Sequence, residues 1–187
     1  MTLTYWGIAI PSADKSLKTN GGDIEKIMTV DIRIRHIEES DYDAIISVLN
    51  EWWGGRHMAT MLPRLFFKHF RETGFFAEVD DKNVGFLIGL FSSTFNSEAY
   101  IHFAGVHPAH RKGGIGRCLY HHFFEVSRKH GRSIIRCVTS PVNKNSIAFH
   151  RSMGFQLEPS TEDSNGIPIH RNYDGPGEDR VLFFKML

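Results

Sequence analysis

Cysteine is scarce in this chain, and long apolar runs are absent. The two cysteines, Cys118 and Cys137, exclude a disulfide-rich scaffold and match no metal-binding spacing. No apolar run approaches the roughly 20 residues that a membrane-spanning helix requires. The mildly apolar first ten residues lack the basic start of a signal peptide. We therefore expect a cytoplasmic protein with no membrane partner.

Net charge is also nearly absent. The formal charge is +1 at pH 7 and there is no continuous basic stripe, so we expect no nucleic-acid partner. A length of 187 residues, with 41% hydrophobic and 23% charged residues, suits one globular domain with a real core. Residues 11–23 are rich in polar and turn-forming residues and are typical of a linker. We predict an N-terminal extension over 1–30 and a single domain over 31–187.

Residues 106–117 carry the most specific signal. They read Val-His-Pro-Ala-His-Arg-Lys-Gly-Gly-Ile-Gly-Arg and join a strand-like stretch, 100–106, to a helix-like stretch, 115–129. Glycines let the backbone approach an anion closely and adopt positive φ. The first N–H groups of a helix lack internal partners and favour negative charge. This turn therefore predicts a site for a phosphorylated cofactor.

Two better-known phosphate loops do not fit, and a third does. A Walker A loop needs Lys-Ser/Thr after its last glycine, but Gly116 is followed by Arg117 and Cys118. A dinucleotide loop needs an acidic residue downstream that is missing here. The spacing Arg111-x-x-Gly114-x-Gly116 resembles the acetyl-coenzyme A loop of the GNAT superfamily of N-acyltransferases. The run from Asn143 to Phe155 resembles the second cofactor motif of the same superfamily.

The resemblance covers about residues 32–187 and implies a fold and an activity. The fold is α/β, a single domain with a mixed, mostly antiparallel sheet flanked by helices. The activity is transfer of acetyl from acetyl-coenzyme A to a primary amine by direct attack in a ternary complex. Periodicity predicts strands over 32–37, 75–79, 84–91, 99–106, 133–139, from 155 and over 181–187, and helices over 41–50, 63–73, 115–129 and from 143. It leaves loops over 51–62 and 158–180.

The cofactor site follows from the two motifs. We expect backbone N–H groups of the turn, with the charge of its basic side chains, to hold the diphosphate. The family resemblance implies that the thioester lies against the strand that ends at Val106, where a main-chain N–H would face it. Asn143 and Ser146 either face the pantetheine or cap the second motif's helix. The cofactor-binding residues are predicted to be Val106, Arg111, Lys112, Gly113, Gly114, Ile115, Gly116, Arg117, Asn143 and Ser146.

The catalytic residues are less well determined. Alternation along the strand puts Glu98, Tyr100, His102, Ala104 and Val106 on one face, which makes His102 and Glu98 candidate general bases. The competing interpretation is a hydrogen-bonded core histidine and an exposed glutamate. The family often has a tyrosine, proposed to protonate the leaving thiolate, where this chain has His150. His150 either takes over that role or is a hydrogen-bonded helix residue.

The acceptor is the least readable part. We predict that the acceptor site is lined by Trp52, Trp53 and His57, although Trp52 and Trp53 would equally fill the core. The carboxylates of 158–180 would attract a cationic amine, or serve only turns. A small-molecule amine fits, a protein acceptor stays open, and the family resemblance allows a homodimer. The histidines match no zinc spacing, so we expect no metal. The alternative function is a non-catalytic coenzyme A-binding module.

Overall fold

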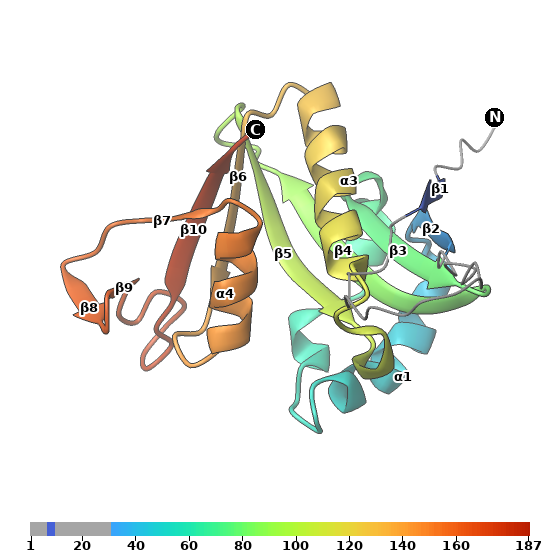
Figure 1. Ribbon diagram of the computed structural model, residues 1–187, viewed down its shortest axis with the longest axis horizontal. Coiled ribbons are helices and arrows are strands. Elements are labelled where there is room, and N and C mark those ends of the chain that lie inside the picture. Colours follow the sequence, from blue (N-terminus) through green and yellow to red (C-terminus); the bar gives the residue numbers. More distant parts are fainter. Residues whose placement is uncertain (1–6, 10–30) are drawn as a thin grey trace, which may run out of the picture.

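A computed structural model describes residues 7–9 and 31–187 of the chain, and its core is a sheet with the strand order β1-β2-β3-β4-β5-β6-β10-β7 (Figure 1). Every neighbouring pair is antiparallel except β5 with β6. These strands are β1 (Gly7–Ala9), β2 (Asp31–His36), β3 (Gly74–Val79), β4 (Lys82–Phe91), β5 (Glu98–Val106), β6 (Ile134–Thr139), β7 (Gln156–Leu157) and β10 (Val181–Met186). The predicted mixed, mostly antiparallel sheet is confirmed.

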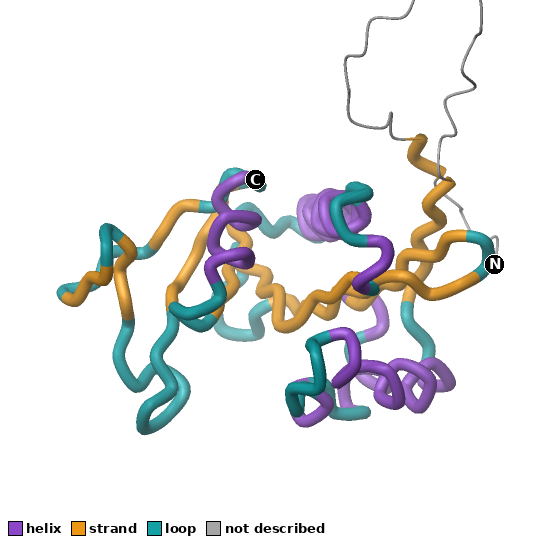
Figure 2. The backbone as a smooth tube through the Cα atoms, turned by 60° about the horizontal axis from the view of Figure 1, so that its bottom comes forward, coloured by secondary structure: helices purple, strands orange, loops and turns teal. Residues whose placement is uncertain are grey.

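The helices cover the two faces of this sheet. They are α1 (Tyr42–Trp52), α2 (Leu65–His69), α3 (Ile115–Lys129) and α4 (Lys144–Ser152), with 3-10 turns at Glu39–Asp41, Ala59–Met61, Arg71–Thr73 and Pro108–His110. Figure 2 shows α3 and α4 on one side of the strands and α1 with α2 on the other. Successive side chains of a strand point to opposite faces of the sheet. In β3, Phe75 therefore joins the core under α3, and Phe76 joins the core under α1 and α2.

The sheet opens between β5 and β6. Their parallel pairing runs only from Glu98–Ile134 to Tyr100–Arg136, whereas β5 continues to Val106 alongside β4. The two strands then diverge, as Figure 1 shows. The backbone of β5 beyond Tyr100 therefore has a strand partner on one side and an opening on the other.

A β-bulge at His102 overturns the predicted alternation of β5. Ile88 lies opposite Phe103 and Gly89 opposite Ile101, so His102 is an extra residue. Ala104 and Val106 pack with the core under α3, whereas the His102 ring stacks on Phe66 of α2. The prediction that His102 shares a face with Ala104 and Val106 is therefore wrong.

The predicted helix over 63–73 is also wrong in length. α2 ends at His69, and a separate 3-10 turn, Arg71–Thr73, follows Phe70. The Thr73 hydroxyl donates to the carbonyl of Gly89 at 2.7 Å, which fixes the turn against β4. Leu65, the first residue of α2, is half exposed. In contrast, α1 runs two residues past its predicted end at Asn50, because Trp52 is buried in the core.

Two further elements were not predicted. β1, within the expected extension, pairs with β2 at the edge of the sheet, while the rest of 1–30 lies outside the described residues. The expected loop over 158–180 contains a hairpin of β8 (Glu162–Ser164) and β9 (Ile167–Ile169). Its turn residues Asn165 and Gly166 both have positive φ, as a tight hairpin requires. Among the described residues, no helix is both long and apolar enough to cross a membrane.

Candidate active site

The turn between β5 and α3 presents free backbone N–H groups. Lys112 has φ +66° and Gly114, which precedes the first residue of α3, has φ +83°. Within the described part of the chain, no main-chain N–H between those of Arg111 and Cys118 donates to a main-chain carbonyl. These N–H groups meet at the positive end of a 15-residue helix. The turn fits the diphosphate of acetyl-coenzyme A.

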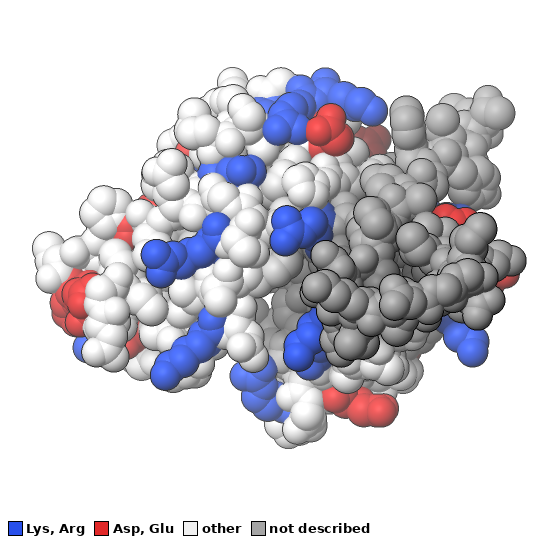
Figure 3. All heavy atoms as spheres, viewed as in Figure 1, with Lys and Arg blue, Asp and Glu red and all other residues white. Residues whose placement is uncertain are grey.

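The Arg111 side chain is not directed at this anion site. Its Nε donates to the carbonyl of Val106 at 3.1 Å, and its Nη2 donates to the carbonyl of Trp52 at 2.5 Å. Arg111 therefore ties the turn to the end of α1. Other cations remain near the turn, and Figure 3 shows Lys and Arg side chains spread over the face that carries α3 and α4.

The second predicted motif forms α4. The Asn143 side chain accepts from the Ser146 N–H at 3.2 Å, so Asn143 caps the helix. Capping was one of the two interpretations offered for this residue. The helix stops where Gly154 adopts φ +81°. Phe149 packs over Gly116 at the start of α3, which joins the two cofactor motifs directly.

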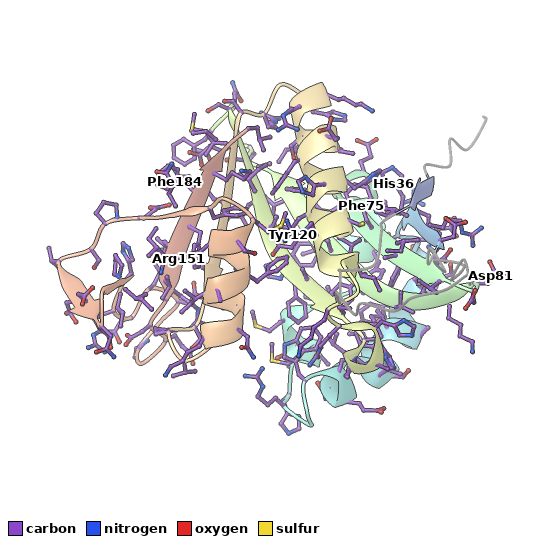
Figure 4. All side chains as sticks on the ribbon, viewed as in Figure 1. His36, Phe75, Asp81, Tyr120, Arg151 and Phe184 are labelled. Atoms are coloured by element: carbon purple, nitrogen blue, oxygen red, sulfur yellow. The ribbon has the colours of Figure 1, made fainter. Side chains whose placement is uncertain are left out.

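His150 is buried between the two helices. Its Nδ1 must donate to the Ser146 carbonyl at 2.8 Å, so Nε2 is left to accept the Tyr120 hydroxyl at 2.9 Å. Burial lowers the pKa of His150, although the Ser146 carbonyl acts to raise it, and burial raises the pKa of Tyr120. Figure 4 shows Tyr120 between α3 and α4. His150 is thus a neutral imidazole with both nitrogens engaged.

His102 has one engaged nitrogen and one that is open. Nε2 must donate to the Met61 carbonyl at 2.7 Å, so the lone pair lies on Nδ1. The ring stacks on Phe66 with 4.5 Å between ring centroids. The residue is partly exposed. This arrangement leaves Nδ1 free to accept a proton.

Glu98 lies in an ion cluster rather than standing free. Its Oε2 is 2.8 Å from Arg136 Nε, and Arg136 Nη1 donates to Glu158. The cluster borders a hollow of about 350 Å³ at the last β5–β6 pair, with Tyr100 and Tyr173 on its walls. Glu98 is therefore a weaker base candidate than His102.

The three residues that were expected to line the acceptor site lie in different environments. Trp52 is only 5% exposed and packs against Phe86, so it fills the core as the alternative interpretation describes. Trp53 is partly buried and lies over Phe103 and Gly105 of β5. His57 is exposed in the segment between α1 and α2. The structure thus keeps Trp53 next to β5 and leaves His57 at the surface.

Sequence comparison assigns this site to a family. The model of the Acetyltransferase (GNAT) family matches residues 36–155. The chain belongs to the GNAT acetyltransferase family. No curated protein sequence matches it. The predicted GNAT membership and the prediction of an N-acetyltransferase are both confirmed.

Solved structures show the same GNAT fold. Ard1 from Thermoplasma volcanium is 18% identical with a TM-score of 0.67, over 83% of this chain and 97% of that one. The ribosomal-protein-alanine N-acetyltransferase of Brucella melitensis is 22% identical with a TM-score of 0.62, over 82% and 99%. Diaminobutyrate acetyltransferase EctA from Paenibacillus lautus, solved with its substrate and coenzyme A, is 18% identical with a TM-score of 0.62, over 83% and 94%. At these identities the likeness concerns the fold.

Sequence reasoning missed several residues around this GNAT site. Tyr120 was not singled out, although its place on α3, five residues after Ile115, was readable. Arg136, Glu158 and Tyr173 surround the hollow, but their partners lie far apart in the chain. Among the described residues, no group of three or more His, Cys, Asp or Glu side chains is arranged to hold a metal ion.

Proposed function

We propose that this chain transfers the acetyl group of acetyl-coenzyme A directly to the primary amine of a small-molecule acceptor. The observation that supports this most strongly is on β5. The strand ends in the anion-binding turn, and four residues earlier it carries His102 with an open Nδ1 beside the divergence from β6. His102 and the turn support the proposal because they lie close together along the chain, on β5 and directly after it.

Acetyl-coenzyme A supplies an activated acyl group, and the chain positions it. The N–H groups from Lys112 to Arg117 hold the diphosphate, together with the dipole of α3. An N–H on the open edge of β5 faces the thioester carbonyl, a kind of contact whose loss costs about 100-fold or more in rate. The opening beyond Tyr100 is where such an N–H is free of β6.

His102 is the general base of this proposal. Its Nδ1 takes a proton from the attacking amine, and the Met61 carbonyl then accepts from the positively charged ring at Nε2. That carbonyl both orients the imidazole and stabilises its charged form. General-base catalysis is worth about 100-fold or more. His102→Ala should therefore lower kcat by about that factor at neutral pH, whereas His69→Ala on α2 should not.

His150 has a positioning role in the proposal rather than an acid role. Its Nε2 carries no proton to donate while it accepts the Tyr120 hydroxyl. It orients this hydroxyl, the one group of the pair that has a proton to give. A His150→Phe variant should leave the alkaline limb of the kcat–pH profile where it is, because a general acid must be protonated and its titration appears on that limb. A limb that disappears would restore His150 as the acid.

The test of the proposed function is thiol release from acetyl-coenzyme A with a panel of amines, measured for the wild-type chain. Amine-dependent release is the expected result. The alternative function, coenzyme A binding without turnover, predicts heat of association with acetyl-coenzyme A in calorimetry but no release with any amine. Absence of both binding and release would remove the proposed function altogether.

A further inference from the structure

The hollow beside the last β5–β6 pair is built for a cation. It has a volume of about 350 Å³ and opens next to the Tyr100–Arg136 pair, where the two strands begin to diverge. Ten residues line it, and they include the charged residues Glu98, Arg136 and Glu158 and the aromatic residues Phe95, Tyr100 and Tyr173. The hollow therefore combines negative charge with aromatic faces beside the proposed reaction site.

The charged part of the wall has an excess of carboxylate. Arg136 is the shared partner of Glu98 and Glu158, so one positive charge faces two negative ones. The side chains of Glu98 and Glu158 are 14% and 26% exposed, so solvent screens them only in part. The nearby Arg180 is shared in the same way by Asp174 and Glu178. Neither arginine cancels the negative charge around it.

The aromatic part of the wall is open to a ligand. Phe95 is 59% exposed and Tyr173 is 50% exposed. Burial raises the pKa of Tyr100, with contributions from Cys137 and Tyr173, so its phenol stays neutral and adds no charge of its own. Aromatic faces attract ammonium groups through the negative charge of their ring faces. An ammonium group thus finds both kinds of partner that it prefers.

The position of the hollow sets the length of the ligand. Tyr100 and His102 are two residues apart on β5 and Glu98 and His102 are four apart, so the usual rise of a strand gives upper limits of about 7 Å and about 13 Å between their Cα atoms, which the bulge at His102 shortens. An amine at His102 Nδ1 therefore lies within reach of a second group in the hollow when an extended aliphatic chain joins them.

We propose that the acceptor is an aliphatic di- or polyamine, whose reacting nitrogen lies at His102 while a second ammonium group binds in this hollow. The inference rests on the proposed function and specifies its substrate class. It makes the hollow a specificity site, in which Glu158 and Tyr173 select for a second positive charge without touching the reacting atoms.

The experiment compares kcat/KM, by thiol release, for α,ω-diamines of increasing length with that for n-alkyl monoamines of the same length. We expect at least a tenfold preference for a diamine, with a maximum at one length. Glu158→Gln and, separately, Tyr173→Leu should each reduce the diamine-to-monoamine ratio several-fold. The matched control is Glu125→Gln, which removes a carboxylate paired with Arg128 on the surface of α3 and should keep the ratio.

Each outcome bears on a distinct claim. Release with monoamines and diamines at equal kcat/KM would overturn this inference and leave the proposed function intact. So would a diamine preference that survives both Glu158→Gln and Tyr173→Leu, or a stronger preference for a peptide amino terminus than for any diamine. No release with any amine would overturn the proposed function, and this inference with it.

Discussion

Replacing Arg111 by Lys should damage catalysis while leaving cofactor binding nearly intact. The Arg111 guanidinium donates to the carbonyls of Val106 and Trp52, at 3.1 and 2.5 Å. Lys keeps the positive charge near the diphosphate but lacks the rigid fork that reaches both carbonyls. The end of α1 would then lose its tie to the turn.

The magnitude follows from the bond that is lost. A hydrogen bond from a charged donor contributes about 1.5–3 kcal/mol, which corresponds to about 10- to 150-fold. The same loss should lower the melting temperature by about 3–12 °C for a chain of this size. The segment between α1 and α2 also supplies the Met61 carbonyl that orients His102, so a loosened α1 end disturbs the base. We therefore expect kcat with the amine to fall by about tenfold or more.

The assay separates this effect from a direct role at the phosphate. Calorimetry should give an acetyl-coenzyme A Kd for Arg111→Lys within about twofold of the wild-type value, because the charge is preserved. Lys112→Gln, which removes a charge from the same turn, should show the reverse pattern, with weaker acetyl-coenzyme A binding and nearly normal kcat. If Arg111→Lys weakens cofactor binding as much as Lys112→Gln does and leaves kcat alone, the tie between the turn and α1 has no catalytic role.

Three further changes test the packing around the site. Burial lowers the pKa of His122 and His150 below the usual value of about 6.5. As the pH falls through that value, the unfolded chain therefore binds more protons than the folded chain does. We expect the free energy of unfolding to decrease from pH 7.5 to 5.5, and to decrease less steeply in His150→Gln. Tyr120→Phe leaves His150 Nε2 buried without a donor and should cost about 1–3 kcal/mol in urea denaturation, and a cost near zero would contradict the hydrogen bond between these two side chains. Gly105→Ala places a Cβ 2.2 Å from the Trp53 ring, so we expect about 1–3 kcal/mol of destabilisation and a change in Trp fluorescence.

The cofactor half of the site was predictable because its signals are local. Glycine spacing fixed the turn, the apolar stripe fixed α3 at Ile115–Lys129, and Asn143 marked the start of α4. Each of these features depends on residues within about one helical turn of one another. Local features of this kind can be predicted from the sequence without knowledge of the tertiary contacts.

The catalytic half depends on contacts that are remote in sequence. The bulge at His102 arises where β5 pairs with β4 at Gly89, and the Phe123 ring of α3 occupies the space that a side chain at Gly89 would fill. The alternation of side chains along β5 gives no information about the position of the Phe123 ring. The same holds for His150, whose tautomer is decided by Tyr120, 30 residues earlier. The alternation rule failed at a bulge, which is where strands often aim a functional side chain.

The link between the cofactor turn and the base runs through main-chain atoms. Arg111 reaches the carbonyl of Trp52, the last residue of α1, and His102 reaches the carbonyl of Met61 in the segment that joins α1 to α2, so both bonds end on backbone atoms. Any residue type at position 61 offers the same carbonyl. Substitutions among the exposed residues of that segment, such as His57, therefore change the acceptor surface without removing the atoms that hold the base. Under the proposed function, acceptor choice can therefore vary in this segment while His102 keeps its hydrogen-bond partner.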